Sequence, residues 1–325
     1  SENYMKLFLN FFLMSVFVVH LAWSDDIPSL KVAFWNVENL FDLIDDPKLN
    51  DDEFAVGGRK NVTQEIYDLK FNNCSYVLAD LNADVLGLCE VENYFVLDEL
   101  NDAFTGRDYK IIHYDSPDSR GIDNALLYDP NVFNVISSTP IQNTLPDGNL
   151  TRDILYVKGE YAGHTLHIFV NHWPSNYGGK EKAIPKRRST ARLLANEVAK
   201  LLSEDPDADI LLMGDFNEDP TDDNVRILKS VNMTSMMASM MGQRKVGTYV
   251  YKGVDYFMDQ IIISDGLNDD KGLIAGKAQI LDKPFYRQQE GDYAHYPFRF
   301  WAGNKLLGGY SDHLAVYVEI LKVSE

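Results

Sequence analysis

Short polar clusters lie where apolar segments of this chain begin or end, and they hold carboxylate, amide and imidazole side chains suited to chemistry. Strand ends in α/β proteins are where functional sites assemble. A single Gly-Asp-Phe-Asn or Ser-Asp-His sequence usually forms only a turn, but six such clusters in one chain are hard to produce by accident. The clusters are Asn36-Val37-Glu38-Asn39, Glu90-Val91-Glu92-Asn93, Asn171-His172-Trp173-Pro174, Gly214-Asp215-Phe216-Asn217, Asp259 within Met-Asp-Gln-Ile-Ile, and Ser311-Asp312-His313.

Glu90 and Asn36 are candidate metal ligands. Glu90 offers a hard oxygen ligand at a strand end, which suits Mg²⁺ or Mn²⁺, with Ca²⁺ as a further alternative. Asn36 is a neutral partner that could orient Glu90 or touch the metal. The alternative for Glu90 is a solvated strand cap. A metal held here would neutralise a nonbridging phosphate oxygen and the leaving oxygen.

Asp259 and His313 form a second candidate pair. A carboxylate beside an imidazole raises its pKa and fixes its tautomer. His313 could then act as a general base on water or stabilise charge on a phosphate. We predict a hydrogen bond between the two side chains; the alternative is that His313 is a buried structural histidine.

Asp215 and Asn217 are expected to face the same centre. A carboxylate can orient an attacking water or protonate a leaving group, and an amide can donate to a phosphoryl oxygen. The alternative for Asp215 is a simple cap of its strand.

In this order the clusters resemble the endonuclease/exonuclease/phosphatase superfamily, whose members include deoxyribonuclease I, from Phe34 to Val316. The stretches 116–123 and 171–179 resemble a secreted bacterial branch with uncertain substrates. The resemblance implies a four-layer α/β sandwich with two mixed β-sheets and a site at one edge between them. It also implies the catalytic and metal-binding roles given above.

His172 resembles the second catalytic histidine of deoxyribonuclease I, which pairs with a glutamate in that enzyme. This chain has no secure counterpart of that glutamate. Asp118 and Asp123 are the two candidates, and otherwise His172 would serve as a phosphate donor only.

Three further side chains complete the expected site. The family pattern brings Asp312 to the metal and Asn171 to the phosphate. Arg120 could bind the phosphate through two parallel hydrogen bonds, although a surface arginine is the alternative. The basic cluster Lys186-Arg187-Arg188 is better interpreted as a solvated helix face than as a substrate contact.

The apolar pattern predicts alternating strands and helices interrupted by hairpins, which fits mixed sheets better than a doubly wound parallel sheet. The expected strands cover 31–35, 84–89, 125–128, 132–137, 154–158, 165–170, 210–213, 260–263 and 314–320, and the expected helices cover 63–81 and 182–202.

The N-terminus has the layout of a secretory signal peptide. Lys6 precedes the apolar run 7–19, and Ala22-Trp23-Ser24 forms a cleavage site. We therefore predict a signal peptide at 1–24, with residues 1–4 preceding the plausible start Met5, and a secreted or periplasmic protein. A retained anchor is the alternative. Residues 25–325 are predicted to form a single catalytic domain.

The formal net charge of -19 repels polyanions at long range, although bound cations can reverse the field locally. We therefore expect DNA or RNA to bind weakly if either is a substrate. The sequence has no basic, aromatic-rich groove and no amphipathic membrane helix, so we predict no stable membrane association; no protein partner is evident. Whether Cys74 and Cys89 form a disulfide stays open.

The expected reaction is metal-assisted, in-line attack of water on a phosphodiester. One metal, two histidines and Arg120 face several carboxylates, a balance that suits a singly charged phosphate. A phosphomonoesterase, or a lipid or inositol headgroup phosphatase, is the alternative on the same scaffold. A catalytically silent binding protein is a third possibility.

Overall fold

The computed structural model describes residues 29–323, so the predicted signal peptide lies outside the described residues. Within this range no helix combines the length and apolar character needed to cross a membrane. The helices are α1 (Gln64–Leu81), α2 (Tyr94–Ala103), α3 (Lys180–Glu204) and α4 (Asp223–Arg226), with short 3₁₀ turns η1 (Ile227–Val231), η2 (Met236–Met240), η3 (Gly266–Asn268) and η4 (Pro284–Tyr286).

Two mixed sheets form the centre of the molecule. The first has the order β13-β17-β1-β2-β4-β3, with β14 also pairing β17, and the second has the order β5-β6-β7-β8-β12-β9. Only β1–β2 and β7–β8 pair in parallel within these sheets. The strands of the first sheet are β1 (Leu30–Leu40), β2 (Val85–Val91), β3 (Lys110–His113), β4 (Asp123–Tyr128), β13 (Leu273–Ala275), β14 (Gln279–Ile280) and β17 (Val316–Lys322). Those of the second are β5 (Asn134–Thr144), β6 (Leu150–Tyr161), β7 (His164–His172), β8 (Ile210–Asp215), β9 (Met233–Ser235) and β12 (Asp259–Ser264). Two small hairpins, β10 (Tyr249–Tyr251) with β11 (Val254–Tyr256) and β15 (Trp301–Ala302) with β16 (Lys305–Leu306), lie outside the sheets.

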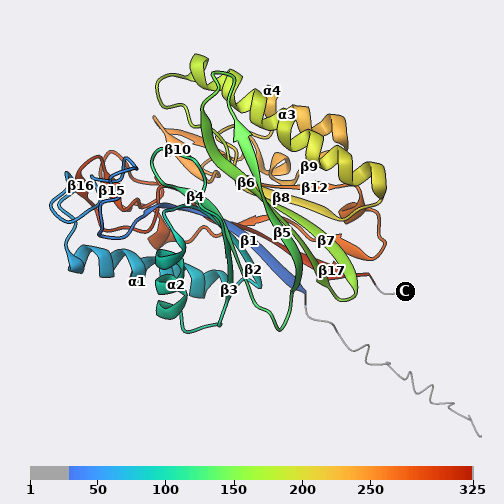
Figure 1. Cartoon of the computed structure of the whole chain (residues 1–325), viewed down its shortest axis with the longest axis horizontal. Helices are drawn as coiled ribbons and strands as arrows, with labels where there is room; N and C mark the ends of the chain where they lie inside the picture. The colour runs from blue at the N-terminus through green and yellow to red at the C-terminus, as the bar shows by residue number, and fades with distance from the viewer. Residues whose placement is uncertain (1–28, 324–325) are drawn as a thin grey trace, which may run out of the picture.

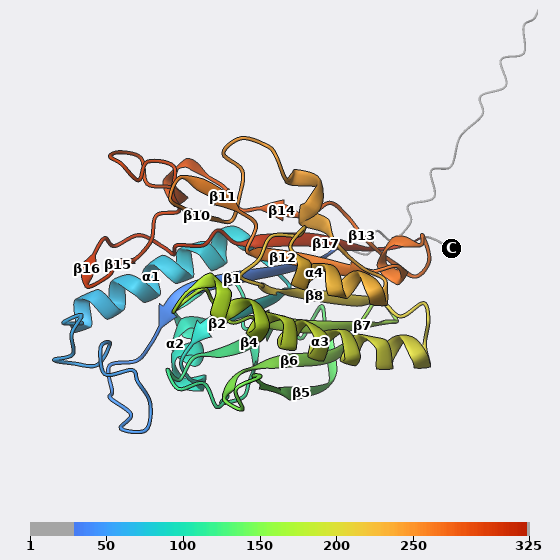
Figure 2. The same ribbon diagram turned by 90° about the horizontal axis from the view of Figure 1, so that it is seen from above.

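The sheets pack face to face, and helices cover both outer faces. Figure 1 shows α1 and α2 on the side of the first sheet and α3 with α4 over the second, and Figure 2 shows the same layers from above. Three apolar clusters match these layers: one between the sheets, one beneath α1 and α2, and one beneath α3. The predicted four-layer α/β sandwich is confirmed.

Local sequence signals set the ends of α1. The Thr63 side chain accepts a hydrogen bond from the Ile66 N–H at the N-terminus of the helix, and Asn82 ends it in a left-handed conformation. Cys74 on this helix and Cys89 on β2 are both buried free thiols.

The strand expected at 132–137 begins at Asn134 and belongs to the second sheet. The turn at 129–131 is present, but β5 pairs with β6. The chain therefore crosses from one sheet to the other, because the residues after the turn pack against β6 instead of returning along β4.

Candidate active site

Strand register assembles the centre of the site. On β8, Asp215 is paired with His172 of β7 on one side and with Asp259 of β12 on the other. From the first sheet, the Asn36 amide donates to Asp215 Oδ2 at 3.1 Å and to Glu90 Oε1 at 3.4 Å. The two sheets therefore meet at these five side chains, as expected from the clusters at the strand ends.

Glu90 is fixed by an unusual local backbone. Its φ is 62°, in the left-handed region, at an irregularity in the pairing of β2 with its neighbours. Its Oε2 accepts a hydrogen bond from the Asn39 N–H at 3.0 Å. Non-glycine residues in this conformation persist only where surrounding contacts hold them, and they cluster at functional sites.

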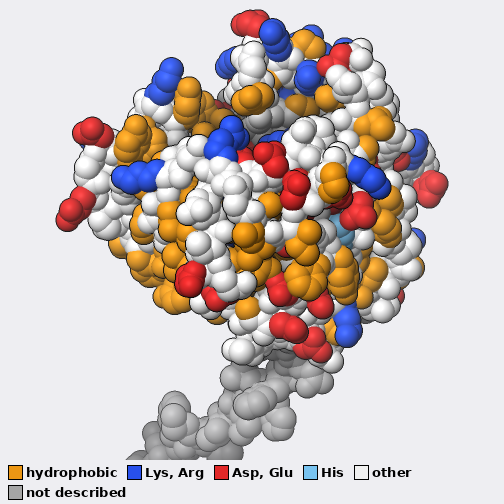
Figure 3. Space-filling view, turned by 60° about the vertical axis from the view of Figure 1, so that its left-hand side comes forward, with side chains coloured by type: hydrophobic (Ala, Val, Ile, Leu, Met, Phe, Trp, Pro, Cys, Tyr) orange, Lys and Arg blue, Asp and Glu red, His pale blue; other side chains and the backbone are white. Residues whose placement is uncertain are grey.

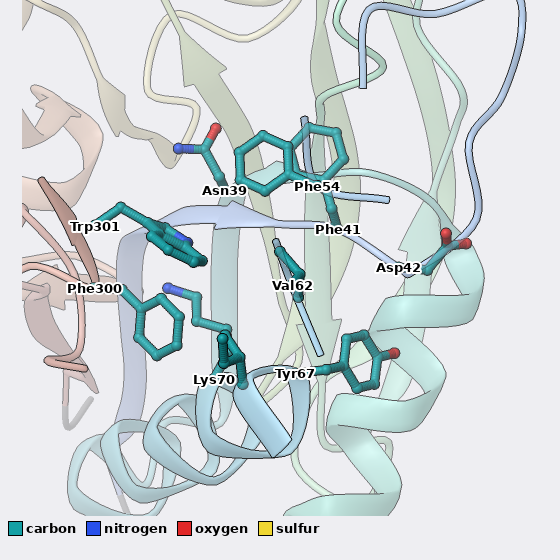
Figure 4. A pocket seen from close by; sticks show the side chains of 10 residues that line it. Asn39, Phe41, Asp42, Phe54, Val62, Tyr67, Lys70, Phe300 and Trp301 are labelled. Carbon is teal, nitrogen blue, oxygen red and sulfur yellow. The ribbon is translucent and has the colours of Figure 1, made fainter. Parts of the chain in front are cut away.

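An aromatic pocket supports the end of β1 beside Glu90 (Figure 4). The Phe41 and Phe54 rings stack with centroids 4.2 Å apart. The Lys70 ammonium lies 4.9 Å from the Phe300 ring centroid and donates to the Val37 carbonyl. This packing holds in place the end of β1 that carries Asn39.

His313 has the predicted carboxylate partner. Its Nδ1 lies 2.7 Å from Asp259 Oδ2, and its Nε2 faces Asp215 Oδ2 at 3.8 Å. Burial opposes protonation of this imidazole, but Asp259 and Asp215 outweigh that effect and raise the pKa of His313 well above its usual value. The Ser311 hydroxyl accepts from the His313 N–H and donates to the Asn36 carbonyl, which ties the loop to β1.

His172 has a different environment. Its Nε2 lies 3.8 Å from Glu90 Oε1 and 3.7 Å from Asp215 Oδ2, while its buried Nδ1 has no hydrogen-bond partner. Burial, followed by the nearby charges of Arg152 and Arg120, lowers the pKa of His172 well below its usual value. The imidazole is therefore held neutral.

Neither carboxylate considered for His172 is its partner. Asp118 accepts instead from Arg152 Nη1 at 3.0 Å, and Asp123 pairs with His113 Nε2 at 2.9 Å. The nearby Arg152 also donates from Nη2 to the Trp173 carbonyl at 2.9 Å.

The donor set fits a hard divalent cation. Carboxylate oxygens of Asp215 and Asp259 lie within 4.8 Å of each other, and the buried Asp259 Oδ1 has no hydrogen-bond partner. Glu90 Oε1 joins them, because it shares the Asn36 amide with Asp215 Oδ2. Burial raises the pKa of Asp215 to about 7; His313 opposes this shift, whereas Asp259 and Glu90 add to it. A cation near these crowded carboxylates would relieve their repulsion, and oxygen-rich sites favour Mg²⁺, Mn²⁺ or Ca²⁺ over softer metals.

Two expected site residues are engaged elsewhere. Asn171 is fully buried; its amide donates to the Phe169 carbonyl at 3.2 Å, and its Oδ1 accepts from Trp173 Nε1 at 3.3 Å. It therefore supports the strand end and does not present a donor to a phosphate. Asp312, expected at the metal, instead accepts from Arg299 Nη2 at 3.0 Å, so this guanidinium engages its carboxylate.

Asn217 and Arg120 remain near the centre. The Asn217 amide donates to the Trp173 carbonyl at 3.0 Å, and its backbone N–H donates to Asp215 Oδ1 at 2.9 Å. Arg120 lies with Nε 3.4 Å from Asp118 Oδ1, and its side chain stays 45% exposed, which leaves guanidinium donors accessible.

The interpretation of the basic cluster at 186–188 as a solvated helix face is wrong for its central residue. Arg187 is fully buried, with its Nε 2.7 Å from Glu218 Oε1. The sequence of α3 alone could not reveal this, because the partner carboxylate comes from the loop after β8.

The sequence analysis assigned no role to Glu38, Arg152 or Arg299. Glu38 is buried and accepts from the Phe300 and Trp301 N–H groups, and burial, with Asp312 adding to it, raises its pKa to about 7. Glu38 belongs to one of the six polar clusters, which was a usable signal. Arg152 and Arg299 lie in segments without any such pattern.

Comparison with known proteins gives consistent results. A sequence profile of the Endonuclease/Exonuclease/phosphatase family matches residues 31–322. Among the curated proteins compared with this chain, no sequence matches.

Solved structures of similar fold come from several organisms. A truncated TDP2 from Caenorhabditis elegans has a TM-score of 0.59 and 16% identity, covering 90% of this chain and 97% of that one. The human Nocturnin catalytic domain with bound sulfate has a TM-score of 0.58 and 18% identity, covering 91% and 95%. A mannosyl-6-phosphatase from Bacteroides thetaiotaomicron has a TM-score of 0.58 and 17% identity, covering 90% and 100%.

Proposed function

Because the chain belongs to the endonuclease/exonuclease/phosphatase family, whose enzymes are hydrolytic phosphoesterases that use divalent metals, we propose that it is a metal-dependent phosphodiesterase. The observation that carries the proposal is the convergence of a Glu90–Asn36 pair and an Asp259–His313 pair on Asp215. The presence of all five of these side chains disfavours a catalytically silent binding protein.

Each side chain has a task that follows from its surroundings. Glu90 would hold Mg²⁺ or Mn²⁺, with its carboxylate oriented by the Asn36 amide that donates to it, and the metal would supply positive charge against the phosphoryl and leaving oxygens. Asp215 orients the attacking water. His313, kept protonated by Asp259, stabilises the negative charge that develops on the phosphoryl group.

His172 has a complementary task on the other side of Asp215. A neutral imidazole can donate one hydrogen bond from Nε2 to a phosphoryl oxygen without giving up a proton. Arg120 would hold a second oxygen of the same phosphate through its accessible guanidinium.

Charge pairing around the centre favours a singly charged diester. Arg152 and Arg120 both lie against Asp118, and Arg299 lies against Asp312. Two guanidiniums share the single carboxylate of Asp118, so one positive charge is left unpaired there, which suits a singly charged diester better than a doubly charged monoester. A monoesterase remains the second candidate, because the Arg120 and Arg299 side chains are still 45% and 42% exposed.

Nucleic acid, if it is the substrate, should bind weakly. The face in Figure 3 carries basic, acidic and apolar side chains interspersed, and the chain as a whole has a net charge of -19. Such a surface gives weak long-range attraction for a polyanion, and salt should weaken binding further.

A substrate panel tests the proposal. With Mg²⁺ or Mn²⁺, the protein lacking residues 1–24 should hydrolyse bis-p-nitrophenyl phosphate faster than p-nitrophenyl phosphate, and plasmid DNA, RNA and sphingomyelin complete the panel. Faster cleavage of the monoester, with DNA and RNA left intact, would favour the phosphatase. No hydrolysis of any phosphoester would refute both.

Export is the remaining part of the proposal. The layout of residues 1–24 supports a cleaved signal peptide and a secreted or periplasmic protein. Fractionation followed by intact-mass measurement should find a product that begins near Asp25. A full-length product retained in the cytoplasm would contradict export.

A further inference from the structure

The loop between β7 and α3, residues 173–179, rises directly from the catalytic edge. Its first carbonyl, that of Trp173, accepts the amide of Asn217 at 3.0 Å, next to His172. Pro174 is still buried, but from Ser175 onwards the loop is exposed. Its outermost side chain is Tyr177, which is 96% exposed.

The base of this loop is fixed by a buried arginine. Arg187 of α3 donates to the Pro174 carbonyl at 2.9 Å, to Asn176 Oδ1 at 3.1 Å and to Glu218 Oε1 at 2.7 Å. Burying an ion pair carries a desolvation cost, so its clearest consequence is a defined geometry. Here that geometry presents the Tyr177 ring to solvent beside the site.

The Arg120 segment lies beside the base of the Tyr177 loop. Arg152 joins the two, because it donates from Nη1 to Asp118 Oδ2 at 3.0 Å and from Nη2 to the Trp173 carbonyl at 2.9 Å. The loop between β1 and α1 contacts the same segment, since the Asn50 N–H donates to the Ser119 carbonyl at 2.8 Å. Tyr177 and Arg120 therefore lie on segments that meet next to His172.

We propose that Tyr177 forms a ring-binding subsite. The face of the Tyr177 ring stacks on the sugar that carries the scissile phosphate, or on the nucleobase attached to that sugar. The subsite rests on the proposed function, since His172 and Arg120 would hold the phosphate itself. Five residues separate Tyr177 from His172, a span of at most about 17 Å, which is compatible with the reach of a nucleotide or sugar phosphate. An exposed aromatic face suits a ring with polar edges.

Calorimetry with Mg²⁺ present tests this subsite directly. The ligands are inorganic phosphate, a nucleoside 5′-monophosphate and a hexose 6-phosphate, each titrated into wild type, Tyr177→Ala and Tyr177→Phe. At least one ring-bearing ligand should bind wild type more tightly than phosphate does. Tyr177→Ala should weaken that ligand about tenfold, as loss of a stacking partner does, and Tyr177→Phe, which keeps the ring, should not.

The outcomes separate the two proposals. The ligand with the larger loss in Tyr177→Ala identifies a base or a sugar as the occupant. If the affinity of each ring ligand relative to phosphate is the same in Tyr177→Ala and wild type, the subsite is refuted while the phosphoesterase proposal stands. If no ring-bearing ligand binds wild type more tightly than phosphate does, the subsite is refuted, and if wild type hydrolyses no phosphoester, both proposals are refuted.

Discussion

Two histidines flank Asp215 at nearly equal distances, yet their surroundings shift their pKa values in opposite directions. His313 Nε2 lies 3.8 Å and His172 Nε2 lies 3.7 Å from Asp215 Oδ2. Burial opposes protonation of both rings, but Asp259 and Asp215 raise the pKa of His313, whereas Arg152 and Arg120 lower that of His172 further. The difference comes from the charged neighbours of each ring, which are carboxylates for His313 and guanidiniums for His172.

This contrast teaches how one site can divide its work. Under the proposed function, a protonated His313 would bring a full positive charge to the phosphate, and a neutral His172 would offer a hydrogen bond without transferring a proton. Sequence spacing alone did not distinguish them, because both are single histidines at strand ends. The following predictions test the division, beginning with the largest expected effect.

Disrupting the Asp259–His313 pair should have the largest effect on kcat. Asp259→Asn and His313→Gln should each lower kcat on the order of 10²- to 10⁴-fold, as expected when a charged acid–base pair is lost. The measurement is kcat at saturating divalent metal. Asp255→Asn is the matched control, because Asp255 pairs with His295 at 2.8 Å outside the site. Equal losses in Asp255→Asn and Asp259→Asn would show that the effect is not specific to the site.

The buried Arg187–Glu218 pair holds the loop that follows His172, because Arg187 also donates to the Pro174 carbonyl. Arg187→Met should lower the free energy of unfolding by about 3–5 kcal/mol, because Glu218 is left as a buried, uncompensated charge. Changing both residues to Met should recover much of the stability, measured by urea unfolding. Equal destabilisation in the single and double variants would show that the unpaired charge is not the cause.

His172 should tolerate an uncharged donor. His172→Gln keeps a side-chain N–H and should retain most of the activity, whereas His172→Ala should lose on the order of 10²-fold in kcat, as for loss of one donor to a developing charge. If His172→Gln is as inactive as His172→Ala, the neutral-donor role is wrong.

The smallest expected effect is a difference between the two histidines in a pH titration followed by NMR. In metal-free protein, ¹⁵N chemical shifts should show His313 still protonated above pH 6.5 and His172 still neutral below it, since the pKa of the first is raised and that of the second is lowered. Titration of both rings near pH 6.5 would remove the basis of the comparison.

The layers and the centre of the site were predictable because they depend on local signals. Apolar strands that end in polar clusters identified Asn36, Glu90, Asp215, Asp259 and His313, and the structure brings these five together. Strand register then brings these side chains close together, since neighbouring strands of one sheet have their ends at a common edge.

The supporting contacts were not predictable because they join residues far apart in sequence. Arg187 was predicted to lie on a solvated helix face, but it is buried because Glu218 in the loop after β8 pairs with it. Asn171 and Asp312 lie in the expected clusters, but their side chains turn to Trp173 and Arg299. A cluster places a backbone segment, whereas tertiary packing decides which way each side chain points.

The most direct test of the central claim compares two glutamates of one segment. Glu90 Oε1 lies 3.4 Å from the Asn36 amide at the proposed metal position, whereas Glu92 accepts a hydrogen bond from the Asp42 N–H, and burial raises its pKa to about 8. Phosphodiester hydrolysis should be measured with increasing Mg²⁺ or Mn²⁺ and in excess EDTA. We predict that Glu90→Gln loses metal-stimulated turnover, while Glu92→Gln, which resembles the protonated native side chain at pH 7, keeps it. Full activity of Glu90→Gln, or of wild type in EDTA, would contradict the account.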